Sequence, residues 1–401
     1  MVVVGRVESM TPEELAPVVK RATGVPGAWP TQWTCRPLAT ELVNPVTVGV
    51  FRVDGRADAP GRPDLPWTVV LKVVTDVSFG GSEMDVGYSH EPQDWNYWNR
   101  EAHVFRSGFL EDLPGPLAAV RCWGCEAVSD DESWIWLEAL EGAAPRRRWS
   151  LDELADAAYD LGAFGAQGLG RVEEIESHAW AARRWLRGWV GSSAAFGARH
   201  AADHEECWRH PLLESVLPSA TRARYLELMA DSERMLATVE SFPRTVAHHD
   251  AQWSNLFHPD NRADARTVAI DWSFLGSAPV GHDLGTHLSG TLCNWGIDPR
   301  EAAAHDATAT AAYLQGLRDF GWTGEEREVV QTRAIVVSLQ MSTFFAAHLS
   351  WICDDLAEDD DDAAAWPAAL AEREGLSVEE AMTAWAAGFD HVLSLGDEAR
   401  V

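Results

Sequence analysis

The stretch RTVAHHDAQWSNLFH, residues 244–258, gathers side chains that could hold a metal ion or accept a proton. The side chains concerned, together with the His-Asp pair in the later segment VGHDLGTHL, are His248, His249, Asp250, Asn255, His258, His282 and Asp283. Two chemistries use such a set: hydrolysis at a metal ion held between His-Asp pairs, and phosphoryl transfer from a nucleotide. A polar loop without chemistry is the third interpretation.

The hydrolysis interpretation needs both His-Asp pairs to be metal ligands. Metal-dependent phosphohydrolases of this kind have an all-α fold and carry the pairs on helices. Here His249 and Asp250 follow an extended segment, and the first third of the chain is rich in strand patterns. We therefore rank this interpretation below phosphoryl transfer.

Phosphoryl transfer needs a carboxylate that takes the proton of the acceptor hydroxyl, and oxygen ligands for a Mg²⁺ ion that bridges the phosphates. Asp250 can be the base. Asn255 follows it in the same loop and offers an amide oxygen to the metal. Asp271, in VAIDW, offers a carboxylate that can bridge Mg²⁺.

A cation on the phosphates completes this chemistry, and the chain contains only two lysines, Lys20 and Lys72. Lys72 lies inside the apolar run WTVVLKVV, where it is at least partly desolvated and needs a partner or a ligand. Glu101, in WNREAHVF, can pair with it and hold it in place. The alternative is a strand lysine that reaches solvent and a solvated helix glutamate.

The first 140 residues must place this lysine and this glutamate side by side. Residues 34–75 have the apolar, β-branched patterns typical of two strands, with the polar segment RADAPGRPD as a long loop between them. Apolar residues recurring every three or four positions from Trp95 to Phe105 predict an amphipathic helix that begins near Pro92. Two more strands are expected in PLAAVRCWGCEAV and SWIWLEAL.

The rest of the chain is predicted to be mainly helical. Ser150 and Glu153 form a capping-box pattern that starts a helix. Four glycines inside or just after this helix follow no strand, so we interpret them as sites of close helix packing and not as a phosphate loop; they are Gly162, Gly165, Gly168 and Gly170. RTVAHHD and ARTVAIDWSF are expected to be short strands joined by a loop, and residues 283–395 to form three or four helices.

The motif His248-x-Asp250-x-x-x-x-Asn255, followed by Asp271, resembles the catalytic motif of the aminoglycoside phosphotransferase and choline kinase family. Other segments are similar to the family in the same order: VVLKVV to its lysine strand, NREAHVF to its glutamate helix, IWLEALEG to its hinge and GHDLGTH to the segment after the metal aspartate. The resemblance covers most of the chain. It implies an α+β, two-lobed protein-kinase-like fold.

By this resemblance an antiparallel sheet lobe for nucleotide binding spans residues 1–138, and a larger helical lobe for catalysis and acceptor binding spans residues 139–401. Lys72 would bind the α- and β-phosphates and pair with Glu101. The backbone of Glu138 and Leu140 would contact adenine.

The resemblance also assigns the catalytic loop. Asp250 is the catalytic base, and Asn255 and Asp271 hold Mg²⁺. Asp283 braces the loop and is not a metal ligand. His248 is grouped with Asp250 as a catalytic-loop residue, and we expect it to fix the loop and not to carry a proton, because Asp250 already fills that role.

Some features depart from the family's pattern. His249 stands where the family usually has glycine, and the nearest candidate for a glycine-rich nucleotide loop, ELVNPVTVGVF, has only Gly49. Residues 76–93 form a long polar stretch. Residues 171–220 are extra relative to a minimal member, and their tryptophans are a candidate part of the acceptor site.

The formal net charge of −30 argues against a nucleic-acid partner, which needs a basic surface, and is compatible with a cationic substrate. Residues 351–401 carry 14 acids against two arginines. In the family the C-terminal helices line the acceptor cleft, so we expect a cationic acceptor. A solvated acidic surface is an equally good explanation.

No apolar run approaches the ~18 residues of a membrane span, and the apolar patch in MVVVGRVESMTPEE is too short for a signal peptide. We therefore expect no membrane partner. Six cysteines without secretory context suggest reduced thiols and a cytoplasmic location. Cys122 and Cys125 form a lone CxxC, which we interpret as a strand-borne apolar pair and not as a zinc site.

Together these features predict an ATP- and Mg²⁺-dependent O-phosphotransferase, with GTP as a possible donor, that acts on a hydroxyl of a small molecule such as a natural product or antibiotic. Two alternatives stay open. One is a kinase-like enzyme that phosphorylates Ser or Thr of a ribosomally made precursor peptide. The other is a nucleotide-binding scaffold without activity.

Overall fold

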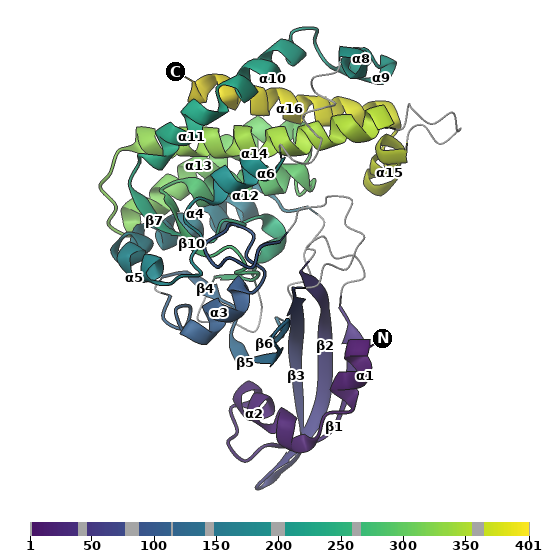
Figure 1. The fold of residues 1–401 in the computed structure, drawn as a ribbon, viewed down its shortest axis with the longest axis vertical. Helices are drawn as coiled ribbons and strands as arrows, with labels where there is room; N and C mark the ends of the chain where they lie inside the picture. The colour runs from purple at the N-terminus through teal and green to yellow at the C-terminus, as the bar shows by residue number, and fades with distance from the viewer. Residues whose placement is uncertain are drawn as a thin grey trace.

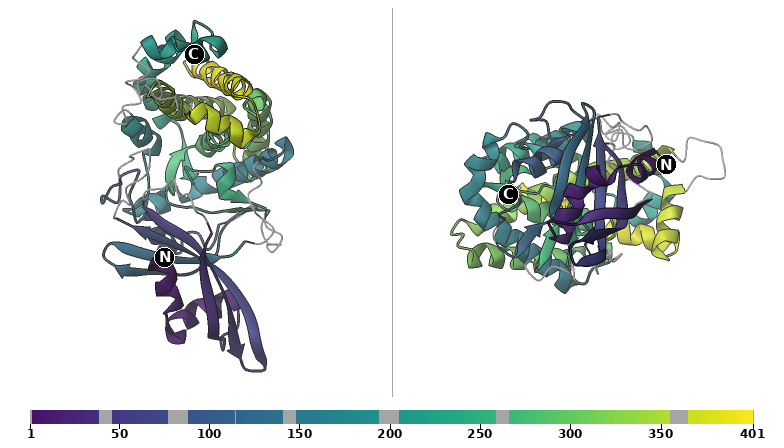
Figure 2. Two further views of the ribbon diagram at one scale, coloured as in Figure 1. Left: turned by 90° about the vertical axis from the view of Figure 1, so that its right-hand side faces the viewer. Right: turned by 90° about the horizontal axis from the view of Figure 1, so that it is seen from below.

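The computed structural model describes residues 2–38, 46–76, 88–113, 115–140, 148–193, 205–258, 266–354 and 365–400. These residues form two lobes, a sheet lobe that contains the N-terminus and a larger helical lobe that contains the C-terminus (Figure 1). The left view of Figure 2 shows the same division, with the long strands and the N-terminal helices at one end and the other helices mainly at the opposite end. The predicted α+β, two-lobed architecture is confirmed.

The sheet lobe is built on five antiparallel strands in the order β1-β2-β3-β6-β5. Their bounds are Trp29–Pro37 for β1, Thr47–Ala59 for β2, Arg62–Thr75 for β3, Cys122–Ser129 for β5 and Glu132–Glu138 for β6. Alternate residues of β2 and β3, such as Val53 and Val69, are fully buried. This alternation is what a sheet with one face on a core requires.

Two helices that the sequence patterns did not indicate precede the sheet: α1 (Val2–Glu8) and α2 (Pro12–Thr23). Thr11 and Glu14 cap α2 reciprocally, with the Thr11 hydroxyl accepting from the Glu14 N–H. Leu15 and Val19 of α2 are fully buried against one face of the sheet, in the same apolar cluster as Trp67. The two helices therefore close that face of the sheet, and Figure 1 shows them beside β1 and the β5 edge.

The predicted long loop between the first two central strands is wrong. The strands β2 and β3 continue through RADAPGRPD and turn tightly between Ala59 and Arg62. Gly61 supplies the positive φ of 72° that this turn needs, and Asp64 also adopts a positive φ. The polar composition reflects exposure at the end of the hairpin and not a break in the strands.

The predicted helix near Pro92 begins later, as α3 (Arg100–Ser107). Residues before it form successive turns because the guanidinium of Arg100 binds their carbonyl groups, those of Pro92, Asp94 and Trp95. Carbonyl oxygens that accept from a side chain in this way do not propagate a helix. Trp95 and Trp98 are packed, as their spacing suggested, but from turns.

The helical lobe begins with α4 (Leu151–Gly168), capped by Ser150 and Glu153 as predicted. Its glycines permit close contact with α13: a Cβ on Gly162 would lie 2.1 Å from the carbonyl oxygen of Tyr313. The packing prediction is thus confirmed for Gly162, and also for Gly165 and Gly168, where a Cβ would lie 3.0 Å and 2.5 Å from neighbouring side-chain atoms. It is wrong for Gly170, where a Cβ would meet no described atom within 4 Å. The helices that follow are short: η1 (Leu169–Arg171), α5 (Val172–Ser177), α6 (Trp185–Ser193), α8 (Glu205–Trp208), α9 (Pro211–Val216), α10 (Thr221–Ala230) and α11 (Ser232–Glu240).

The last third of the chain supplies the core of this lobe. It forms five α-helices within the described residues, one or two more than expected: α12 (His282–Cys293), α13 (Ala302–Asp319), α14 (Glu326–Asp354), α15 (Ala365–Glu374) and α16 (Val378–Ala399), with η3 (Pro299–Glu301) before α13. The helix α14 packs against α12, α16 and α6. Its segment Glu326–Leu349 is long and apolar enough to cross a membrane, contrary to the sequence expectation, but 83% of that window is buried within the protein, as in a core helix.

Short strands lie where the two lobes meet. The strand β4 (Leu117–Ala119) pairs in parallel with β9 (Thr267–Ala269), and β9 pairs with β8 (Leu256–Phe257), which follows η2 (Trp253–Asn255). The strand β7 (Arg244–Ala247) pairs with β10 (Gly276–Pro279). The two predicted strands exist, but they do not pair with each other; each has another partner.

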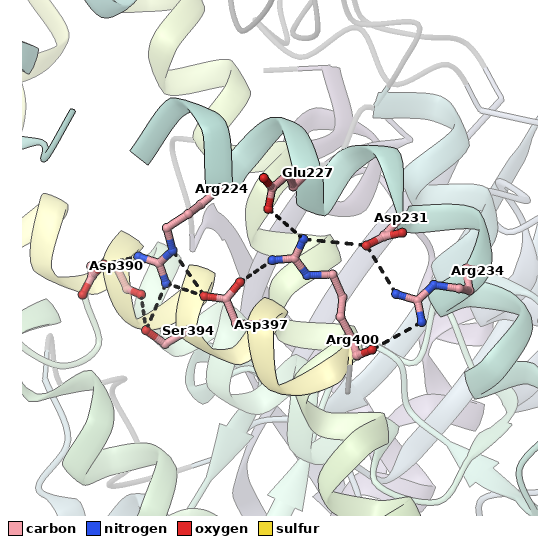
Figure 3. A network of polar contacts seen from close by, with 8 residues as sticks. All are labelled: Arg224, Glu227, Asp231, Arg234, Asp390, Ser394, Asp397 and Arg400. Carbon is pink, nitrogen blue, oxygen red and sulfur yellow. Dashed lines mark hydrogen bonds and ion pairs between the residues drawn. The ribbon is translucent and has the colours of Figure 1, made fainter. Parts of the chain in front are cut away.

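Ion pairs connect α10 to α16 and to Arg400 near the C-terminus, at the end of the helical lobe that lies away from the sheet lobe. Arg224 of α10 binds Asp390 and Asp397 of α16, and Arg400 binds Asp397 and Glu227 (Figure 3). Asp390 and Asp397 of the C-terminal region are therefore paired with the protein's own arginines.

Candidate active site

Lys72 is the centre of the candidate site. Its Nζ lies 2.6 Å from Oε2 of Glu101 on α3 and 2.9 Å from Oδ1 of Asp271, which follows β9. The lysine and the glutamate side chains are almost fully buried, whereas the Asp271 side chain keeps 27% exposure. Three segments distant in sequence thus bring their charged groups together, as the sequence predicted for Lys72 and Glu101.

The pKa values in this group follow from burial and charge. Burial acts to lower the pKa of Lys72, but the carboxylates of Asp271 and Glu101 outweigh it and raise that pKa. Burial raises the pKa of Glu101. Burial also acts to raise the pKa of Asp271, but the Lys72 ammonium outweighs it and lowers that pKa. The site therefore holds a fixed ammonium ion opposite a carboxylate that stays ionised.

Hydrogen bonds fix the helix α3 to the segment after Asp271. Oε1 of Glu101 accepts the backbone N–H of Trp272 at 3.2 Å, and the neighbouring Arg100 donates to the carbonyl of Ser273 at 3.1 Å. Asp271 itself has a positive φ of 58° and accepts from the Ser273 hydroxyl at 2.7 Å. These contacts hold the Asp271 carboxylate toward Lys72.

His248 uses both ring nitrogens within the loop. Its Nδ1 accepts the backbone N–H of Asp250 at 3.2 Å, so the ring hydrogen is on Nε2, which donates to the carbonyl of Ile270 at 2.8 Å. Burial lowers the pKa of His248, so the ring stays neutral. This geometry supports the expected role in fixing the loop.

Asp250 and Asn255 lie together as the motif requires. The amide nitrogen of Asn255 donates to the Asp250 carbonyl at 3.0 Å and to its Oδ2 at 2.8 Å. Gln252 donates to Oδ1 of Asp250 at 3.1 Å. The carbonyl of Asn255 accepts the N–H of Ile270, so Asn255 lies directly beside the residue before Asp271, just beyond the β8–β9 pair.

Burial and the nearby Asp271 carboxylate raise the pKa of Asp250 to about 7. A carboxylate with such a pKa is a competent general base near neutral pH. The like charge that raises it also shows that this site would gain from a bound cation.

Asp283, at the start of α12, braces the catalytic loop. Its two carboxylate oxygens accept the backbone N–H groups of His248 and His249, each at 2.9 Å. His249 has a positive φ of 68°, a conformation that costs a side-chain-bearing residue roughly 1–3 kcal/mol. The two hydrogen bonds to Asp283 hold His249 in this conformation.

The donor set fits a metal–nucleotide complex better than a protein-only metal site. Among the described residues, no group of three or more His, Cys, Asp or Glu is arranged to hold a metal ion. His249 and His282 are buried, with ring centroids 4.7 Å apart and close to Trp185. The oxygens of Asn255 and Asp271 suit Mg²⁺, which is usually bound by one or two carboxylates plus substrate phosphates.

The candidate adenine-binding segment begins at Glu138, the last residue of β6. The Glu138 N–H donates to the Arg121 carbonyl at 2.9 Å, and its side chain binds Arg121. Leu140 packs on the apolar cluster that includes Val74 and Ile135. The segment from residue 141 to 147 lies outside the described residues, as do 77–87 of the polar stretch and 355–364 of the acidic run.

The extra tryptophans of the helical lobe mainly pack. Trp180 stacks on His178, and Trp208 contacts Tyr225. Trp185 lies behind the catalytic loop, stacked on Trp189 at 5.5 Å. The Trp185 ring lies 5.9 Å from the ring of His249 in that loop, measured between centroids.

Sequence reasoning missed two groups at the site, Arg100 and the Gln252–Asn294 pair. Arg100 is fully buried and donates to carbonyls of three separate segments, and burial lowers its pKa to about 9. The sequence feature that could have indicated Arg100 is its position directly before Glu101. For the Gln252–Asn294 pair, the sequence feature that could have drawn attention is the position of Gln252, two residues after Asp250.

A strand lysine and a helix glutamate of the sheet lobe meet an aspartate of the helical lobe beside the Asp250 loop. This is a kinase-like fold. Similar solved structures include a microcompartment-associated aminopropanol kinase, with 15% identity over 91% of this chain and 93% of that chain and a TM-score of 0.48. An amicoumacin kinase in complex with AMP-PNP, Ca²⁺ and Ami has 13% identity, 86% and 88% coverage and a TM-score of 0.46.

An aminoglycoside-3'-phosphotransferase of type VIII has 18% identity, 77% and 94% coverage and a TM-score of 0.43. No family model and no curated protein sequence matches the chain. With similarities this low, function has to be inferred from the residues of this chain.

Proposed function

We propose that this protein is an ATP- and Mg²⁺-dependent phosphotransferase that phosphorylates a hydroxyl group of a small molecule. The observation that carries the proposal is the contact of Lys72 with both Glu101 and Asp271, next to the loop that bears Asp250 and Asn255. Each of these residues suits one part of phosphoryl transfer, and no single segment of the chain contains them all.

Asp250 takes the proton of the acceptor hydroxyl. The amide groups of Asn255 and Gln252 hold its carboxylate in one orientation. The desolvation that raises its pKa also makes it a stronger base than an exposed aspartate.

Lys72 binds nucleotide phosphates, and Glu101 keeps its ammonium in place. Asn255 and Asp271 would hold Mg²⁺, which when bound neutralises charge that develops on the phosphates. The Lys72 ammonium, which contacts Asp271 in this structure, would bind phosphate oxygens of the nucleotide. The backbone of Glu138 and Leu140 would contact the base, and ATP is the expected donor, with GTP as the alternative.

The proposed acceptor is a hydroxylated natural product or antibiotic. The formal net charge of −30 favours a cationic acceptor over an anionic one, because the protein's field attracts cations. A cytoplasmic location is proposed with it, since that compartment supplies ATP.

The test is nucleotide turnover with a panel of hydroxylated natural products, including aminoglycosides and neutral aromatic compounds, with ATP and GTP in separate arms. Product masses are read for the gain of one phosphoryl group. Acceptor-dependent turnover with a phosphorylated product supports the proposal.

A panel that includes precursor peptides separates the rival functions. Phosphorylated Ser or Thr in a peptide, with no small-molecule product, would move the proposal to peptide maturation. Tight nucleotide binding without turnover on any acceptor would instead favour a scaffold.

A further inference from the structure

Asp250 receives a hydrogen bond on each carboxylate oxygen, and the two donors differ in kind. Asn255, on Oδ2, belongs to the proposed metal site. Gln252, whose Nε2 lies 3.1 Å from Oδ1 and 3.4 Å from Oδ2, is assigned to neither the metal nor the nucleotide in the proposed function. Within the described parts of the chain, the other side chain that the Gln252 amide binds is Asn294, at the end of α12.

Asn294 anchors the far side of the Gln252 amide. Its Nδ2 donates to Oε1 of Gln252 at 2.7 Å and to the carbonyl of Gly290 at 3.0 Å. Because Oε1 of Gln252 accepts, its Nε2 must face Asp250. The Gln252 amide is thus fixed at both ends, which a side chain that merely fills space does not need.

Gly290 makes this arrangement possible. A Cβ at Gly290 would lie 2.5 Å from the Cβ of Gln252, which is far inside contact distance. The lack of a side chain at this position of α12 lets the catalytic loop approach the helix closely enough for the Gln252–Asn294 bond. Gly290 and Asn294 therefore fit the position that Gln252 takes in the catalytic loop.

We propose that Gln252 is a positioning residue that orients the Asp250 carboxylate for phosphoryl transfer, with Asn294 holding Gln252 in place. This inference rests on the proposed function. In the reaction the acceptor oxygen forms a bond to the γ-phosphorus, and the bond from that phosphorus to the bridging oxygen breaks, leaving its electron pair on ADP. The hydroxyl proton passes to Asp250. Gln252 keeps one carboxylate oxygen engaged, so that the other lone pairs point toward the acceptor.

The test compares four variants with wild-type protein: Gln252→Met, Gln252→Glu, Asn294→Ala, and Gln252→Met combined with Asn294→Ala. Methionine keeps length and volume but removes the donor, and glutamate keeps shape but places a like charge beside Asp250. The control is Gln315→Met, the same substitution at an exposed residue of α13 whose amide binds Asp319. Melting temperature and ATP affinity are measured for each variant to establish that it is folded.

Removal of a hydrogen bond to a charged group is worth a factor of roughly ten to a hundred. We expect Gln252→Met to lower kcat by about that factor, with KM for ATP unchanged, and Gln252→Glu to lower it at least as much. Asn294→Ala should lower kcat less. The double variant should be no slower than Gln252→Met, because both changes remove one linked contact.

A wild-type kcat for Gln252→Met in folded protein would overturn the inference. So would a loss confined to KM for ATP, or additive losses in the double variant. These results leave the proposed function standing, because wild-type protein is active in each of them. If wild-type protein shows no ATP turnover with any acceptor, water included, the proposed function and this inference fall together.

Discussion

At the scale of single residues, Lys72 shows how a buried charge marks a functional site. A lysine in a strand of valines is stable there because two carboxylates lie within 3 Å of its Nζ. Only one of them, Glu101, is needed to balance the charge. The second, Asp271, keeps 27% exposure and is the carboxylate that a bound metal ion would attract.

Removal of either Lys72 or Glu101 should weaken ATP binding. We expect Lys72→Met and Glu101→Gln each to raise the Kd for ATP, and the double variant to be little worse than the worse single one, because the pair acts together. Calorimetric titration with ATP and Mg²⁺ measures all three. Additive losses would show that the two residues act independently and would remove the pairing from the account.

The proposed role of Asp271 as a metal ligand predicts how ATP affinity depends on Mg²⁺. Since Asn255 and Asp271 offer few oxygens, Mg²⁺ should bind weakly to the protein and more tightly in the presence of nucleotide. Titration with ATP should show an affinity that rises with Mg²⁺ in the wild-type protein and does not in Asp271→Ala. Purified protein that contains tightly held zinc would point back to a metallohydrolase.

At the scale of elements, the catalytic loop depends on a helix that it does not belong to. Asp283 of α12 accepts the N–H groups of His248 and His249 and so holds the positive φ of His249. The residue that bears the strain and the residue that holds it are more than thirty positions apart in sequence.

Asp283→Asn should therefore lower kcat by more than it lowers ATP affinity. The amide can accept only one of the two backbone N–H groups, so the loop relaxes and Asp250 moves. Steady-state kinetics and calorimetry on the same sample measure both quantities. Unchanged kcat in folded Asp283→Asn would show that the loop keeps its geometry without the brace.

The sequence was most informative where the chemistry is local. The loop from His248 to Asn255 and the capping box at Ser150 were predicted because their spacing in sequence determines their geometry. The late start of α3 was not. The guanidinium of Arg100 that binds the carbonyls before α3 is itself positioned by the carbonyls of Trp180 and Ser273, which no local pattern connects to it. The pairing partners of β7 and β9 were missed for the same reason, because strand pairing depends on contacts distant in sequence.

At the scale of the whole molecule, the acidic residues do not all have the same role. In the described part of the C-terminal region, Asp390, Asp397 and Glu398 are paired with arginines of other helices. They join α16 to its neighbours and are not available to a ligand in that state. If the acceptor is cationic, its KM should rise clearly from low to physiological ionic strength, as the Debye length falls from about 30 Å to about 8 Å. A KM that does not change with salt would assign recognition to neutral groups.

Buried histidines predict how stability depends on pH. Burial lowers the pKa of His287 to about 4 and of His305 and His348 to about 3, from an ordinary value of 6.5. In the unfolded chain these rings bind protons below about pH 6.5, whereas in the folded protein they do not until pH 4 or below. The free energy of unfolding is therefore complete above pH 6.5 and falls as the pH drops toward 4.

The variant His305→Leu isolates one of these rings. Neither ring nitrogen of His305 has a hydrogen-bond partner among the residues that the structure describes, so leucine removes the proton-binding group without breaking a described hydrogen bond. Denaturant unfolding between pH 7 and pH 4 should show a shallower loss of stability than in the wild type, by up to about 1.4 kcal/mol per pH unit. His90→Gln, at an exposed residue, is the control. Parallel curves for all three proteins would contradict the prediction.

The central claim is that Asp250 is the base of a phosphoryl-transfer site, and Asp250→Asn tests it most directly. The measurement is the single-turnover rate of phosphoryl transfer to the identified acceptor, made beside calorimetric ATP binding on the same protein. Asparagine keeps the shape but cannot take the proton, so transfer should fall by about 10²–10⁴-fold or more while ATP affinity stays near that of the wild type. Near wild-type transfer by folded Asp250→Asn would contradict the claim.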